Sequence, residues 1–222
     1  MFADDLQDGI DAYKNKDYKT AYKLWLPLAG QGGANLQFML GMMHSRGTGV
    51  PQNYIEAVKW FRLAADQKPP KAQYSLGMMY YHGEEVAEDD AEAMKWYRKA
   101  AEQGHAKAQY HLGAMYADGQ GVLEDSKEAV KWYLAAAEQG NALSQYHLGM
   151  MYYDGEGVER NYVTAYAWWH IAAYNGNEYA KNAKETLFVK LREKFTPDQI
   201  TEAYSYRREL LKKYPKAEHY TA

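Results

Sequence analysis

Two histidines at matching positions are the first residues whose chemistry could matter. His111 and His147 stand 36 residues apart, and imidazole nitrogens are common zinc ligands. A zinc site needs ligand nitrogens at about 2.0–2.1 Å and at least a third protein ligand, which the neighbouring sequence does not supply. Packed helices lie roughly 8–10 Å apart, so equivalent positions on two helices do not bring both rings to one ion. We therefore expect surface or groove histidines and no metal site.

Glycine-rich and acidic segments suggest two other kinds of chemistry, phosphate binding and acid–base catalysis. Gly119-Gln-Gly121 lacks the lysine of a P-loop and does not join a strand to a helix. The carboxylate pairs Glu84/Glu85 and Asp89/Asp90 fall in loops and at helix starts, which explains them without catalysis. No serine stands in a Gly-x-Ser-x-Gly motif, and no His-Glu-x-x-His motif occurs. These patterns predict no catalytic residue and no cofactor.

The composition excludes several classes of site and of protein. The 222 residues include no cysteine, which excludes disulfides, cysteine-ligated zinc, iron–sulfur clusters and a thiol nucleophile. A net charge of −3 argues against a dedicated nucleic-acid binder. A mean hydropathy of −0.69, without a long apolar run, argues against membrane insertion. The unusual feature is 22 Tyr and 6 Trp against 5 Phe, since Tyr and Trp suit both helix packing and binding surfaces.

The elements that must position these residues repeat every 36 residues. The in-phase residues are Leu40-Gly41, Leu76-Gly77, Leu112-Gly113 and Leu148-Gly149, together with Trp60, Trp96, Trp132 and Trp168. Self-similarity at one fixed period is the signature of a repeat architecture. We interpret residues 1–222 as one domain that comprises a degenerate repeat at 3–37, full repeats at 38–73, 74–109, 110–145 and 146–181, and a different C-terminal segment at 182–222.

Each repeat predicts a helix–loop–helix hairpin. In the third full repeat, a first helix from Ala106 to Tyr116 ends at the glycine loop, and a second helix runs from the N-cap Asp125 to about Glu138. Capping boxes are expected at Asn53/Glu56, Asp89/Glu92 and Asp125/Glu128. No segment alternates as a strand, so the chain is expected to be all-α. One hairpin cannot bury its apolar stripe alone, so neighbouring hairpins must stack, with the in-phase tryptophans and glycines between them.

Four segments depart from the regular pattern. Lys68-Pro69-Pro70 replaces the usual glycine junction, so we expect a local irregularity there. Glu85 replaces a loop glycine, and Pro27 falls inside a predicted helix, which it should kink. After the repeats, Thr196 and Pro197 resemble an N-cap and a first helical position, which predicts a terminal helix pair at about 178–194 and 197–213.

Together, the motifs of the third full repeat resemble Sel1-like repeats. The residues that carry the resemblance are Tyr110-His-Leu-Gly113, Gly119-Gln-Gly-Val122, Lys131-Trp-Tyr133 and Ala136-Ala-Glu-Gln-Gly140. Tetratricopeptide repeats, which belong to the same superfamily, have a period of about 34 residues and lack this glycine loop. The resemblance implies an all-α, right-handed α-solenoid of stacked helix–loop–helix repeats, closed by a C-terminal capping helix pair.

The same resemblance implies a function. Sel1-like proteins are similar to tetratricopeptide proteins in acting as scaffolds, so we expect a non-enzymatic bacterial adaptor that binds a protein or peptide along a concave face of first helices. The alternative is an envelope hydrolase or a peptidoglycan- or glycan-binding protein, because some cysteine-rich members are linked to β-lactam binding or hydrolysis. This chain lacks their cysteines. We expect a monomer without nucleic-acid partners, membrane insertion or cofactors.

Positions that vary between repeats on the first helix of each hairpin are the candidate contact residues. They recur at spacings of three and four residues and therefore share one helix face. Met and Tyr among them suit adaptable partner surfaces. The predicted partner-binding residues are Arg46, Met78, Tyr81, His82, His111, Asp118, His147, Met150, Tyr153 and Asp154.

The first five residues bear on the compartment. Phe2-Ala3 followed by Asp4-Asp5 resembles the end of a cleaved signal peptide, with a small residue at the cleavage point. This favours a periplasmic or secreted protein in which Met1 is an added start. A cytoplasmic protein that begins at its native methionine is the alternative.

Overall fold

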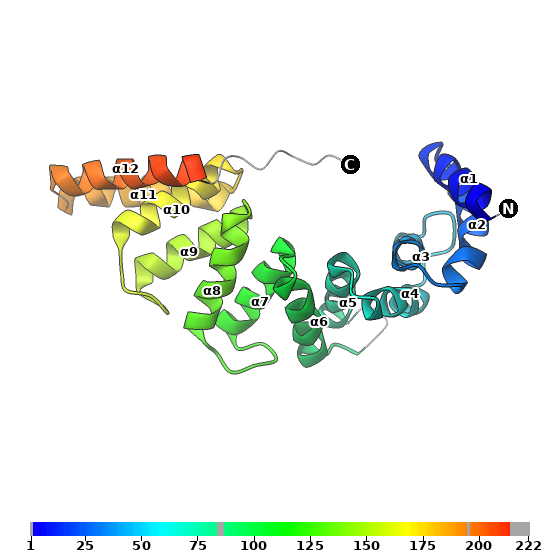
Figure 1. Cartoon of the computed structure of the whole chain (residues 1–222). Coiled ribbons are helices and arrows are strands. Elements are labelled where there is room, and N and C mark those ends of the chain that lie inside the picture. Colours follow the sequence, from blue (N-terminus) through cyan, green and yellow to red (C-terminus); the bar gives the residue numbers. More distant parts are fainter. Residues whose placement is uncertain (1, 84–86, 195, 214–222) are drawn as a thin grey trace. The chain divides into compact units, whose positions relative to one another are not determined.

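Helices account for all the regular structure in the described part of the chain. The computed structural model describes residues 2–83, 87–194 and 196–213, which contain twelve helices and no strand (Figure 1). The helices are α1 Phe2–Lys14, α2 Tyr18–Gly30, α3 Ala34–Arg46, α4 Tyr54–Asp66, α5 Pro70–His82, α6 Asp90–Glu102, α7 Ala106–Asp118, α8 Ser126–Glu138, α9 Ala142–Asp154, α10 Tyr162–Tyr174, α11 Glu178–Lys194 and α12 Pro197–Lys213. The all-α prediction is confirmed, and so are the bounds of the terminal pair α11 and α12.

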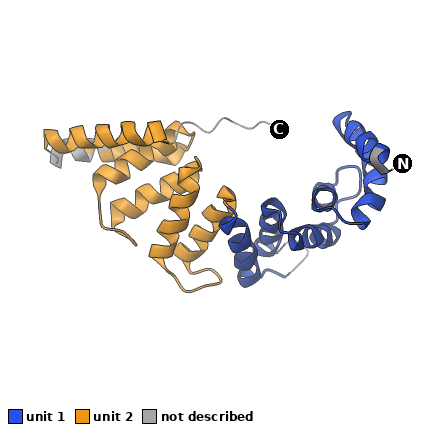
Figure 2. Ribbon diagram, viewed as in Figure 1, with its two compact units in different colours: residues 1–103 blue, residues 104–222 orange. Residues whose placement is uncertain are grey.

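The helices follow one another as hairpins. The pairs α1/α2, α3/α4, α5/α6, α7/α8 and α9/α10 each pack together, and α11 and α12 both pack against α10. The contacts divide the chain into unit 1, residues 1–103 with α1–α6, and unit 2, residues 104–222 with α7–α12 (Figure 2). The interpretation of residues 1–222 as one domain stays a prediction. No helix in the described ranges is both long and apolar enough to cross a membrane.

The predicted N-caps begin three of the second helices. Each cap side chain accepts the backbone N–H three residues on, from Glu56 to Asn53, from Glu92 to Asp89 and from Glu128 to Asp125, at 2.9–3.1 Å. The glutamates do not complete the expected capping boxes, because the N–H group of each cap residue donates to a carbonyl of the preceding first helix. Each glutamate carboxylate pairs instead with a lysine one turn further along the helix. Such a cap contributes about 1 kcal/mol to helix stability.

The glycines inside the first helices lie under aromatic rings of the second helices. A Cβ at each of these glycines would lie 2.2–2.8 Å from a ring atom, far inside van der Waals contact. The pairs are Gly9–Trp25, Gly41–Phe61, Gly77–Tyr97, Gly113–Tyr133 and Gly149–Trp169. The close helix approach predicted from the in-phase glycines is therefore confirmed, and the ring is its physical reason. Gly9 and Trp25 also identify α1/α2 as a hairpin of the same design with a shorter loop.

Glutamines join successive repeats. Gln67, Gln103 and Gln139 each donate from Nε2 to the Oε1 of a glutamine thirty residues earlier, at 2.7 Å, and Asn175 donates in the same way to Gln145 at 2.9 Å. Gln37, Gln73 and Gln145 in turn donate to a backbone carbonyl of the preceding second helix. Because the accepting glutamines Gln37, Gln73, Gln109 and Gln145 are buried, this pairing satisfies amides that would otherwise be costly to bury.

The irregular segments have specific local structures. Lys68 adopts a φ of +74°, where Gly104, Gly140 and Gly176 stand in the other repeats, and Pro69 then serves as the N-cap of α5, which Pro70 opens. The helix α2 continues through Pro27 to Gly30. Thr196 and Gln199 form the predicted capping box at the start of α12. The prediction about Glu85 falls outside the described residues.

Candidate functional site

The predicted contact residues of unit 1 lie near the ends of α3 and α5. Arg46 and His82 are the last residues of these helices, and both are exposed. Met78 is half-buried on α5. The ring of Tyr81 lies 5.2 Å from His82 and 6.3 Å from the buried ring of Tyr97, so Tyr81 contributes to packing as well as to the surface.

In unit 2 the structure brings two predicted residues into a continuous row of rings. His111 contacts Tyr110 on α7 at 5.1 Å, Tyr110 contacts His147 on α9 at 5.8 Å, and His147 contacts Tyr146 at 5.5 Å. Tyr146 then contacts Tyr179 on α11 at 6.1 Å. We call His111, Tyr110, His147, Tyr146 and Tyr179 the ring row. It connects α7 and α9, the first helices of two successive hairpins, with the terminal helix α11.

The inner side of the ring row is supported by the second helix α8. Tyr133 is buried, and its ring stacks on His147 with 5.1 Å between centroids and 9° between planes. Burial raises the pKa of the Tyr133 hydroxyl well above its usual range, and the charge of Asp118 adds to this shift. Burial also lowers the pKa of His147, against the opposing effect of Asp118. His147 and Tyr133 are therefore both neutral near pH 7.

The outer side of the ring row is accessible and apolar. Tyr179 is 72% exposed, Leu143 44% and Met150 37%. Leu143, Tyr146, His147 and Met150 follow the spacing of a single helix face on α9. Large apolar side chains that stay exposed beside partly buried rings are a common feature of binding surfaces.

Acidic residues end both helices of this surface. Asp118 and Asp154 are exposed, close α7 and α9, and have no basic residue beside them in the last turn. A carboxylate in the last turn opposes the helix dipole, which favours cations at that end. The equivalent positions in unit 1 hold Arg46 and His82, which agree with the dipole. At the end of α9, Arg160 donates to the Asp154 carbonyl at 3.0 Å and so supplies a cation. The end of α7 at Asp118 has no basic residue in its last turn and thus carries negative charge that helix stability does not require.

Tyr153 lies elsewhere in unit 2. Its ring contacts Tyr162 at 5.2 Å and Trp169 at 5.6 Å, and it packs against the buried cluster that contains Tyr166 and Leu187. The structure therefore gives Tyr153 a packing role.

His111 and His147 both contact Tyr110, and no group of three His, Cys, Asp or Glu residues suited to a metal occurs in the described residues.

Sequence reasoning missed three members of the ring row. Tyr110 and Tyr146 share the repeat phase of Tyr74 and so do not vary between repeats, although each is only half-buried. Tyr179 lies beyond the last glycine loop and 36 residues after Leu143, so continuing the period into α11 could have identified it.

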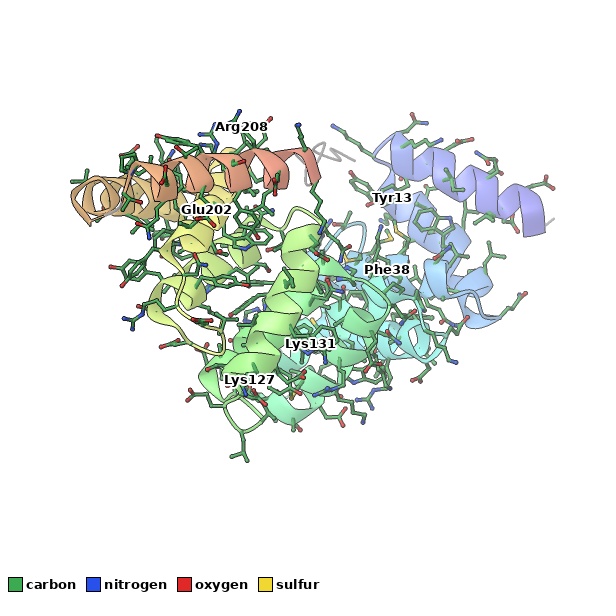
Figure 3. All side chains as sticks on the ribbon, turned by 60° about the vertical axis from the view of Figure 1, so that its left-hand side comes forward. Tyr13, Phe38, Lys127, Lys131, Glu202 and Arg208 are labelled. Atoms are coloured by element: carbon green, nitrogen blue, oxygen red, sulfur yellow. The ribbon has the colours of Figure 1, made fainter. Side chains whose placement is uncertain are left out.

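Lys127 and Lys131, labelled in Figure 3, lie along α8 and are exposed there.

Comparisons with known proteins agree with this architecture. The Sel1 repeat family model matches residues 34–69, 70–105, 106–141 and 142–177, so each matched repeat begins with a first helix. The matched repeats have the predicted period and start four residues before the expected bounds. No curated protein sequence matches the chain.

Solved structures of three bacterial proteins are similar to this chain. A Sel1 repeat protein from Oxalobacter formigenes is 32% identical, with a TM-score of 0.80 over 92% of this chain and 84% of that one. The protective antigen c5321 of uropathogenic Escherichia coli, which displays the Sel1-like repeat fold, is 27% identical, with a TM-score of 0.60 over 100% of this chain and 57% of that one. A putative Sel1 repeat protein from Klebsiella pneumoniae shares the fold at 21% identity, with a TM-score of 0.51 over 84% of this chain and 92% of that one.

These matches agree with the helical hairpins and the 36-residue period. Because the family model covers four consecutive repeats, and the Oxalobacter formigenes relative exceeds 30% identity over most of both chains, the resemblance predicted from the motifs is confirmed. The chain belongs to the Sel1 repeat family and has its α-solenoid fold.

Proposed function

We propose that this chain is a non-enzymatic protein-interaction scaffold and that unit 2 binds a segment of a partner protein across the ring row. The observation that carries the proposal is the continuity of the rings over α7, α9 and α11, with Tyr179, Leu143 and Met150 exposed beside them. Sel1 repeats are commonly protein-interaction scaffolds, which supports the general class. Aromatic and Met side chains supply much of the affinity in such interfaces.

The charge of this surface indicates the chemistry of the partner. Asp118 and Asp154 place carboxylates where the helix dipoles already favour cations. Tyrosine rings attract lysine and arginine through their faces. We expect the bound segment to combine apolar side chains, which cover Met150 and Leu143, with at least one basic side chain near Asp118 or Asp154.

A selection from a random peptide library tests this proposal on the full chain. Peptides that bind should lose at least about thirtyfold in affinity when Tyr179→Ala and Met150→Glu are combined, because hot-spot side chains each contribute more than about 1 kcal/mol. The matched control is Leu134→Glu on α8, which changes a leucine that is 36% exposed outside the ring row and should leave the affinity unchanged. Thermal unfolding of each variant verifies that the fold is intact.

Two results of the peptide selection would contradict the proposal. If the selected peptides bind the double variant as tightly as the unchanged chain, or if Leu134→Glu weakens them equally, the ring row is not the binding surface. The hydrolase or glycan-binding alternative gains no specific support from the described residues. Saturable binding of peptidoglycan fragments that Tyr179→Ala abolishes, without any peptide binding, would favour that alternative instead.

A further inference from the structure

A separate cavity in unit 1 has the properties of a second binding site. It has a volume of about 700 Å³ and lies among α1, α2 and α3. Its apolar wall is formed by Leu6, Ile10, Tyr13, Trp25, Leu36 and Met39. The rings of Tyr13, labelled in Figure 3, and Trp25 stack at 5.4 Å in this wall. The volume falls within the usual range of ligand sites, about 300–1,000 Å³, and an apolar lining is typical of such sites.

The apolar surface at this position is larger than in the other repeats, although Leu36 and Met39 also pack against the buried cluster that contains Trp25 and Leu40. Leu36 is half-buried, whereas the equivalent positions in the other three repeats hold small residues that are fully buried, Ala72, Ala108 and Ser144. Met39 occupies the position that His147 holds in unit 2, where the histidine ring fills the space against Tyr110 and Tyr133. The cavity in unit 1 therefore combines large apolar side chains with open space.

The one charged side chain among the residues that line the cavity is a lysine. Lys14 lines it and is exposed, and no carboxylate within the described ranges pairs with its ammonium group. Asp11, one turn earlier, accepts a hydrogen bond from Gln7 at 3.0 Å. The first turn of α3 also lines the cavity, and its N-cap Gly33 provides no side-chain acceptor. The free N–H groups of that turn carry the positive end of the helix dipole.

We propose that this cavity binds an apolar segment of a partner protein that carries a carboxylate, with the apolar side chains against Leu6 and Met39 and the carboxylate near Lys14 and the start of α3. Leu6 in the wall is 39% exposed, so the cavity opens to solvent and does not enclose a ligand. Its α1 side spans about two helical turns, or about 12 Å, which suits two or three side chains of a peptide. The site does not involve the ring row and stands or falls independently of it.

Two fluorescent probes that differ in charge test the chemistry of the site on the full chain. The anion 1-anilinonaphthalene-8-sulfonate should bind saturably, and about fivefold more tightly than neutral N-phenyl-1-naphthylamine, because an ammonium group and a helix dipole favour the anion. Lys14→Gln should remove this preference, whereas Lys19→Gln on α2 should not. Lys14 is exposed, so this variant keeps the fold even if a cavity variant does not.

The apolar wall has a matched pair of variants. Leu6→Glu should abolish binding of both probes, and Leu26→Glu, which changes a leucine of equal 39% exposure outside the cavity, should leave it unchanged. Random peptides that displace the sulfonate probe should combine apolar residues with Asp, Glu or a C-terminal carboxylate. The proposal would be overturned if the two probes bound with equal affinity or if both leucine variants had equal effects. It would also be overturned if the displacing peptides lacked a carboxylate, or if laurate displaced the probe and no peptide did.

Discussion

The ring of His147 on α9 lies nearly parallel to the ring of Tyr133 on α8, with centroids 5.1 Å apart. Tyr133 in turn covers Gly113 on α7, so one stack connects three helices. The same histidine contacts Tyr110 and Tyr146 in the ring row. Packing between repeats and the proposed binding surface therefore share residues, since one side of each ring supports the fold while the other is left for a partner.

The contact between Gly113 and Tyr133 predicts a large effect for one added methyl group. Gly113→Ala would place a Cβ 2.8 Å from Tyr133 Cδ1. We expect the free energy of unfolding to fall by about 1–3 kcal/mol, because the ring cannot move without disturbing the stack. Urea denaturation followed by circular dichroism measures the change.

Gly30→Ala is the control for this variant. Gly30 ends α2 in a helical conformation, and a Cβ there meets nothing within 4 Å. This variant should be more stable than the unchanged chain by about 0.5–1 kcal/mol, because alanine loses less backbone entropy on folding than glycine. A Gly113→Ala chain as stable as the Gly30→Ala chain would refute the close-approach explanation.

The positive φ of Lys68 predicts a stabilising substitution. Lys68 has a φ of +74° where the other full repeats use glycine. Lys68→Gly should raise the free energy of unfolding by about 1 kcal/mol, because glycine avoids the steric cost of the left-handed region. Lys71→Gly, inside α5, should instead lower it by about 0.5–1 kcal/mol. Thermal unfolding compares the two, and a lower midpoint for Lys68→Gly would contradict the strain argument.

His170 predicts a dependence of stability on pH. Its Nε2 accepts a hydrogen bond from Arg207 Nη1 at 3.3 Å, and burial with the charges of Arg207 and Lys184 lowers the His170 pKa to about 4. The unfolded chain takes up this proton at about pH 6.5. Stability should therefore fall as the pH drops from about 6.5 to about 4, because only the unfolded state gains the proton in that range.

His170→Gln provides the measurement for this pH dependence. Glutamine keeps an acceptor for Arg207 but does not titrate. The variant should lose less stability than the unchanged chain between pH 7 and pH 5 in urea denaturation, while carboxylates contribute equally to both chains. Parallel pH profiles would show that His170 does not carry the effect.

Much of the fold could be predicted because its local signals repeat. Asn53, Asp89 and Asp125 mark helix starts through side-chain chemistry that depends only on nearby residues. The terminal pair α11 and α12 was predicted to the residue from one proline and one capping box. The pairing of Gly9 with Trp25 was missed, because the shorter loop between α1 and α2 breaks the 36-residue phase.

The candidate site was less predictable for physical reasons. His147 and Asp118 were identified because they vary between repeats, and the structure places them within electrostatic range. Tyr146 keeps the repeat phase of a core residue, yet its ring lies between His147 and Tyr179, which depends on the spacing of three helices. The cavity beside Trp25 depends on how α1 and α3 each pack against α2, for which no local pattern exists.

Site-specific photocrosslinking tests the central claim most directly. In one variant, p-benzoylphenylalanine replaces Met150 beside the ring row, and in a second variant it replaces Lys127 on α8. Both variants are incubated and irradiated in extracts of cells that naturally produce the protein. We predict a discrete crosslinked partner from position 150 and none from position 127. No adduct at position 150, or the same adducts at both positions, would contradict the account.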